Sequence, residues 1–200
     1  MDAEATIDAV RDQTETERDR LGSDKVLIAA TDATLETEAV LTAAATRESG
    51  LADILSRWAA ETDSNAATQF EGAAEAAAER ANRIDVDAGN PDGFIDHLET
   101  VSGTAQRVGA GLIAAPLVAD RFYLQVVSFF INEADEGRAD TFREIRREAS
   151  ALDHGETALK HLSESDRETA AAAATEAIDA AYDDYAKTLE AMGLDPKPVC

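Results

Sequence analysis

Apolar residues recur every three to four positions along most of this chain, which is the spacing of one face of an α-helix. No run of apolar β-branched residues alternates with polar ones between turn residues, as a strand would require. The pattern therefore predicts an all-α protein. It is clearest near the C-terminus, where one helical stripe consists of Ile178, Ala181, Tyr182, Tyr185, Leu189 and Met192.

Capping and turn residues divide this pattern into separate helices. We expect Gly50 to end a helix, Pro116 to end or kink another, and the capping box from Ser165 to Glu168 to begin the last one. The connection 85–93 is rich in turn residues and marks the middle of the molecule. The expected helices cover residues 3–20, 24–49, 51–60, 63–84, 94–98, 101–135, 138–162 and 165–193.

The two halves of the chain repeat one order of elements. Each half has a helix, a glycine (Gly50 or Gly137), and a second helix in which a phenylalanine (Phe70 or Phe142) precedes a charged run. Two helical hairpins joined by one long connection describe a ferritin-like four-helix bundle. We expect this fold with additional terminal helices: an N-terminal helix over 1–22, the bundle over 23–163, and a C-terminal capping helix and tail of the same domain over 164–200.

The charge of the chain limits its partners. Against 41 Asp and Glu stand 18 Lys and Arg, so the net charge is −23 and the surface repels nucleic acids and anionic lipids. Only four of the cations are Lys, which is typical of proteins in concentrated salt, where the Debye length falls to about 3 Å at 1 M. We expect a halophilic protein with salt cations at its acidic surface, and no nucleic-acid or membrane partner. An ordinary acidic protein is the alternative.

Targeting and redox signals agree with a cytoplasmic protein. The N-terminal segment is polar and acidic and has no basic-then-apolar signal pattern. The longest apolar stretch, 108–127, is interrupted by Pro116, Asp120 and Arg121, so we expect a buried helix and not a membrane span. The only cysteine, Cys200, has no partner for an internal disulfide. The sequence does not decide whether the protein forms a homodimer.

Ferritin-like bundles that carry chemistry hold two metal ions in the core. Such a site takes a Glu from each of two helices and a Glu-x-x-His from each of the other two. Over most of 24–162 the chain resembles the rubrerythrin branch of this superfamily, in a haloarchaeal type. Residues 27–50 resemble its first helix, 70–80 its second and 151–162 its last. The resemblance implies a helical bundle that often binds two irons and acts on peroxide or oxygen.

The same resemblance assigns the ligand positions. The Glu of the first helix falls at or near Asp32, which we expect to face the core, and that of the third helix lies nearest to Asp120. Most of the other ligands are missing, because alanine or arginine takes their place. Such a loss removes the cost of holding several buried carboxylates without a cation. The two Glu-x-x-His motifs fall on Ala77 with Arg80 and on Ala151 with His154.

Several of these residues also have a structural interpretation. His154 is more often a half-buried helix residue than a ligand, and the aromatic segment 121–130 is more often core than a cofactor site. Glu71, Glu75 and Glu79 form a ridge at i, i+4 spacing, which is typical of a solvated face.

Three functions follow from these observations. The leading hypothesis is a non-catalytic, degenerate ferritin-like protein that serves as a binding or interaction module, with no catalytic residues and no cofactor. The alternative is a divergent metal-dependent oxidoreductase acting on peroxide or oxygen, with iron or manganese held by Asp32, Asp120 and His154. In the third, the acidic surface itself is the function, as a cation buffer or a docking face.

Overall fold

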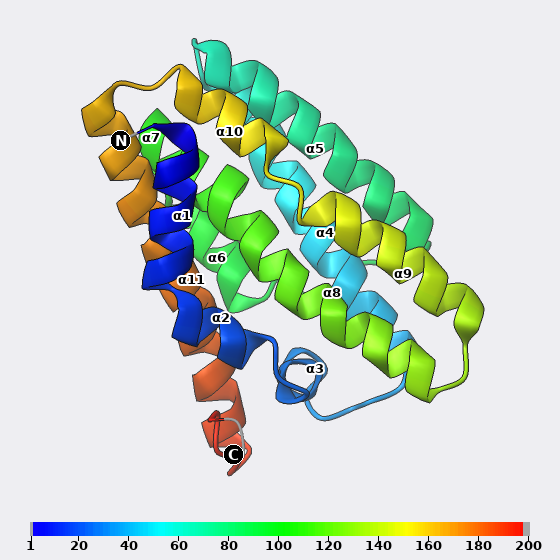
Figure 1. Cartoon of the computed structure of the whole chain (residues 1–200). Helices are drawn as coiled ribbons and strands as arrows, with labels where there is room; N and C mark the ends of the chain where they lie inside the picture. The colour runs from blue at the N-terminus through cyan, green and yellow to red at the C-terminus, as the bar shows by residue number, and fades with distance from the viewer. Residues whose placement is uncertain (1, 198–200) are drawn as a thin grey trace.

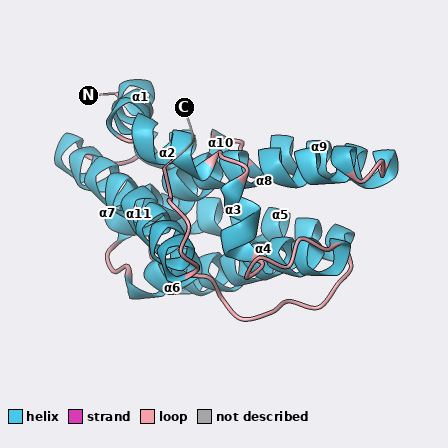
Figure 2. Cartoon of the chain, turned by 90° about the horizontal axis from the view of Figure 1, so that it is seen from below, coloured by secondary structure: helices cyan, strands magenta, loops and turns pink. Residues whose placement is uncertain are grey.

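The computed structural model describes residues 2–197, which fold into helices and their connections without a strand (Figure 1). The prediction of an all-α protein is therefore confirmed. Two antiparallel hairpins form the centre of the molecule and lie in two layers, one above the other (Figure 2). The first hairpin is α4 (Thr37–Ala60) with α5 (Asn65–Ile84), and the second is α8 (Ala115–Asn132) with α9 (Glu136–Ala149).

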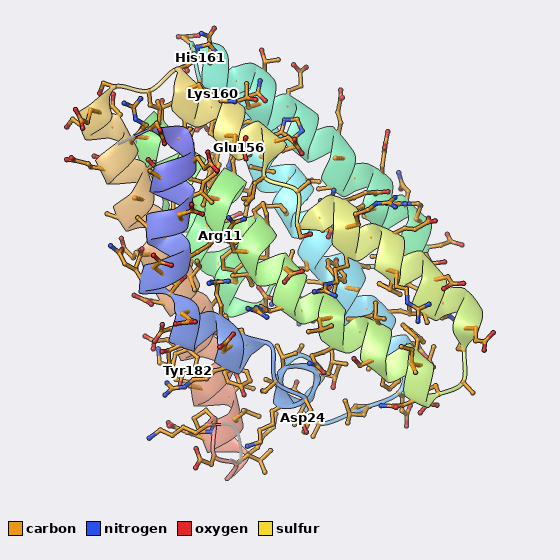
Figure 3. The ribbon with its side chains drawn as sticks, in the orientation of Figure 1. Arg11, Asp24, Glu156, Lys160, His161 and Tyr182 are labelled. Atoms are coloured by element: carbon orange, nitrogen blue, oxygen red, sulfur yellow. The ribbon has the colours of Figure 1, made fainter. Side chains whose placement is uncertain are left out.

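The remaining helices flank the hairpins. The N-terminal helices pack along the C-terminal helix, and Tyr182 lies where they meet (Figure 3): its hydroxyl accepts a hydrogen bond from Arg20 Nη1 at 2.9 Å. The connection between the hairpins is itself largely helical. The connection contains α6 (Gly93–Thr100) and α7 (Thr104–Arg107). The other flanking helices are α1 (Ala3–Gln13), α2 (Glu15–Leu21), α3 (Lys25–Ala30), α10 (Asp153–Lys160) and α11 (Glu164–Ala191).

Aromatic side chains fill the interior of both hairpins. Trp58 of α4 meets Phe70 of α5 edge-to-face, with ring centroids 5.7 Å apart. Phe142 of α9 stacks on Tyr123 and Phe130 of α8, at 6.0 and 5.3 Å. The aromatic segment 121–130 thus belongs to the core, as expected. Its side chains Phe122, Tyr123 and Phe130 are buried, and large aromatic side chains bury much apolar surface.

A long helix crosses the centre of the molecule from α7 to α8, with a π-helical segment, η1 (Val108–Ala114), in its middle. Among the described residues it alone is long and apolar enough to cross a membrane by length and composition. In the most apolar window of this helix, 61% is buried inside the protein. This agrees with the expected buried helix.

Pro116, which we expected to end or kink a helix, lies just after the π-helical segment and does not end the long helix. The backbone N–H of Ala115 bonds to the carbonyl of Ala110, five residues back, so the usual register changes just before the proline. Pro116 then occupies the first turn of α8, where a missing N–H is tolerated. The helix continues to Asn132.

Gly50 also fails to end a helix. α4 runs through it to Ala60, because the absent side chain leaves room for Ile95 of α6: a Cβ at Gly50 would lie 2.9 Å from the Ile95 Cγ2. The expected helix 24–49 breaks earlier, at 31–36, where Asp32 and Ala33 have φ values of 47° and 61°. Gly50 is therefore a packing residue and not a stop signal.

Two boundaries in the C-terminal third also differ from prediction. The expected helix 138–162 is divided at 150–152 into α9 and α10. The last helix begins two residues earlier than its predicted capping box, because Ser163 Oγ accepts the N–H of Asp166 at 3.1 Å. Its end before Gly193, which has a φ of 76°, is confirmed. Cys200 lies outside the described residues.

Candidate functional site

A buried ion pair joins the two helices of the first hairpin, and a hydrogen bond links it to the second hairpin. Glu48 of α4 and Arg80 of α5 are only 2% and 6% exposed. Arg80 Nε and Nη2 lie 3.0 and 2.8 Å from Glu48 Oε2. From the other layer, the Tyr123 hydroxyl of α8 donates a hydrogen bond of 2.6 Å to Glu48 Oε1. One carboxylate thus joins three helices.

Helical periodicity carries these charged residues into the core. Glu48 follows Leu41, Ala44 and Ala45 by seven, four and three positions, so it lies on the buried face of α4. Sequence reasoning assigned no role to Glu48. Its place on an apolar stripe is the signal that would have found it.

The surroundings of Tyr123 keep the proton on its hydroxyl group. Burial, and next the negative charge of Glu48, raise the pKa of Tyr123 well above 10. Tyr123 therefore donates to Glu48 as a neutral phenol near neutral pH. A buried carboxylate is costly unless it is paired and hydrogen-bonded, and here Arg80 and Tyr123 meet both conditions.

A cavity of about 320 Å³ lies beside Arg80, between α4, α5, η1 and the junction of α9 with α10. Its inner surface is apolar except for Arg80, and its mouth carries acidic residues. The buried lining includes Leu55, Gly111, Leu112, Ala149 and Arg80, and the exposed lining includes Glu79, Glu148, Ala151 and Asp153.

Close helix contacts made possible by glycine shape this cavity. A Cβ at Gly72 of α5 would lie 2.7 Å from His154 Cε1, and one at Gly155 would lie 2.4 Å from the Leu112 carbonyl oxygen. α10 therefore lies directly against both α5 and η1. His154 Nδ1 is 3.0 Å from Gln69 Oε1, which fixes the half-buried ring at the edge of the cavity.

The structure brings some of the predicted site residues together and separates others. Arg80, Ala151 and His154 all line the cavity. Asp32 does not face the core as expected, because it lies exposed in the left-handed turn after α3. Asp120 Oδ1 accepts a hydrogen bond from Arg146 Nε at 2.9 Å. The three weak metal candidates therefore have separate surroundings.

The glutamate ridge of α5 and His161 lie at the surface. Glu71, Glu75 and Glu79 are exposed on α5, in agreement with the solvated ridge expected there. His161 ends α10 beside Lys160, whose Nζ lies 4.0 Å from Glu156 Oε2 (Figure 3). Within residues 2–197, no three His, Cys, Asp or Glu side chains are arranged to hold a metal ion.

A comparison with models of known protein families, with curated proteins and with solved structures finds no match for this chain. The protein is therefore characterised by its all-helical fold, by the buried pair of Glu48 and Arg80, and by the cavity beside it.

Proposed function

We propose that this chain is a non-catalytic, degenerate ferritin-like protein, related to the rubrerythrins, that serves as a binding module in the cytoplasm of a halophile. The order of its helices supports this proposal: two antiparallel hairpins are joined by one long connection, and further helices precede and follow them. The cavity between these helices provides a place for a bound molecule.

The pair of Arg80 with Glu48 is the observation that carries the proposal. In a di-metal bundle the metal ions offset the charge of the buried carboxylates. In this chain the guanidinium of Arg80 offsets the charge of Glu48. Because Arg80 already neutralises Glu48, this carboxylate is not free to hold a metal cation, and Ala77 and Ala151 supply no ligand. These residues do not fit a di-iron centre.

The oxidoreductase alternative has weaker support. It requires Asp32, Asp120 and His154 to approach one another, whereas each has its own environment: an exposed turn, the pair with Arg146, and the contact with Gln69. His154 alone borders the cavity.

Elemental analysis tests the proposal. The full chain is purified natively in high salt and then incubated, without oxygen, with Fe(II) or Mn(II). We expect neither metal to be retained, because the core lacks a set of ligands and its carboxylate Glu48 is already paired with Arg80. Two tightly held iron or manganese ions per chain would overturn the proposal. Metal uptake that the substitution His154→Ala abolishes would instead support the oxidoreductase.

A further inference from the structure

The lining of the cavity beside Arg80 indicates which kind of molecule fits it. We propose that this cavity binds a small organic amine, which is a compound with an apolar body and one ammonium group. The inference rests on the proposed binding function and adds the chemical class of the ligand. Three features of the cavity support it: its walls, its floor and its mouth.

The walls are suited to an apolar body. They are formed mainly by aliphatic side chains from α4, α5, η1 and α8, and the volume of about 320 Å³ lies at the small end of ligand pockets in proteins, which hold roughly 300–1,000 Å³. A compact hydrocarbon or aromatic group displaces water from these walls favourably. The wall residues are Leu51, Leu55, Ala73, Ala76, Leu112 and Pro116.

The floor does not attract an anion. Arg80 is the one Lys or Arg side chain in the lining, and Glu48, which does not line the cavity, contacts two of its three guanidinium nitrogens. Because this ion pair is internally compensated, the floor presents a polar surface without net charge. A carboxylate ligand would gain little there.

The mouth is negatively charged and uncompensated. Glu148 is paired with Arg83, but Glu79 and Asp153 form no ion pair with any described residue. Both are exposed at the opening of the cavity. At molar salt, charges act only over about 3 Å, so a ligand must place its cationic group in direct contact with these carboxylates. A primary ammonium group does so when its apolar body fills the cavity.

Three probes of similar size but different charge separate the effect of the apolar body on binding from the effect of the charged group. Binding of 2-phenylethylamine, 2-phenylethanol and 3-phenylpropanoate to the full chain is measured by calorimetry in about 3 M KCl, where screening is strong. We expect the amine to bind about threefold more tightly than the alcohol, as fits one screened, partly exposed ion pair. We expect the carboxylate to bind more weakly than the alcohol, because the carboxylates at the mouth repel it.

Variants locate the binding and its charge preference. Ala76→Leu fills the cavity and is expected to abolish binding, whereas Ala172→Leu on the exposed face of α11 leaves it unchanged. The double substitution Glu79→Gln with Asp153→Asn is expected to reduce the affinity for the amine to that for the alcohol, without affecting the alcohol.

Each other outcome overturns the inference. Absence of binding by both amine and alcohol, equal binding of all three probes, or binding that survives Ala76→Leu contradicts an amine site in this cavity. None of these results bears on metal retention, so the proposed non-catalytic function is tested separately.

Discussion

Glu48 is a buried residue whose carboxylate bonds to side chains of both layers of this protein. Its two carboxylate oxygens have different partners: Arg80 within the first hairpin and Tyr123 across from the second. Each of the three groups is buried, so none can exchange its partner for bulk water. Loss of one member leaves the others unsatisfied.

Removal of the carboxylate by Glu48→Ala tests this dependence. We expect a loss of about 3–5 kcal/mol in the free energy of unfolding, because the guanidinium of Arg80 stays buried without a counter-charge. Urea denaturation in high salt measures it. The exposed pair of Glu99 with Arg57 serves as the control, and Glu99→Ala is expected to cost at most about 1 kcal/mol. Equal losses at the two sites would contradict a special role for Glu48.

At the scale of elements, the contact of the long central helix with α11 depends on the absence of a side chain. A Cβ at Gly109 of η1 would lie 2.0 Å from the carbonyl oxygen of Ala170, which is backbone and cannot rotate away. The π-helical register of η1 and this glycine together let two helix backbones touch. The cavity borders the same segment at Gly111 and Leu112.

The substitution Gly109→Ala is expected to destabilise the protein by about 1–3 kcal/mol or more, because overpacking here has to move a helix. The control is Gly137→Ala in α9, where the nearest atom to the new Cβ is 3.7 Å away. There the better helix propensity of alanine should make the change neutral or stabilising by up to about 1 kcal/mol. Thermal unfolding of both variants distinguishes them, and a neutral Gly109→Ala would refute the close contact.

At the scale of the whole molecule, the net charge of −23 opposes folding when salt is scarce. The acidic residues lie mainly on outer helix faces, as the exposed ridge of α5 illustrates. Screening by concentrated salt removes this repulsion while carboxylate hydration keeps the surface soluble. The proposed halophilic environment would account for the composition without a charged partner.

We therefore expect the helical circular dichroism signal to weaken in about 0.1 M KCl and to recover at molar KCl, where the Debye length is about 3 Å. Glu71→Gln with Glu75→Gln on the exposed ridge should lower the salt concentration at the midpoint of this transition. A fully folded protein at low salt would instead favour an ordinary acidic protein.

Local signals predicted the helices well where they were strong. The start of α5 near Ser64, the long central connection and the end of α11 follow from capping and turn residues alone. Gly50 misled because its role depends on a distant residue, Ile95, which packs against it. At Pro116, where an end or a kink was expected, a π-helical register precedes the proline and the helix continues. A glycine that stops a helix and one that admits a neighbour look the same in sequence.

The candidate site was predictable in part. The resemblance pointed to Arg80, Ala151 and His154, which do line one cavity, but it led to Asp32 and not to Glu48. Asp32 was misplaced because a turn with positive φ breaks the helix that would have carried it into the core. The partners of a buried charge lie 32 and 75 residues away along the chain.

The sequence by itself determined the all-helical class, the acidic surface and the buried stripes, because helical periodicity and charge are local properties of the chain. Only the tertiary structure decided which polar and charged side chains pair with one another in the core. Burial makes an unpaired charge costly, so the packing of α4, α5 and α8 selects Arg80 and Tyr123 as the partners of Glu48. The same packing leaves a cavity beside these residues, and its lining comes from several helices.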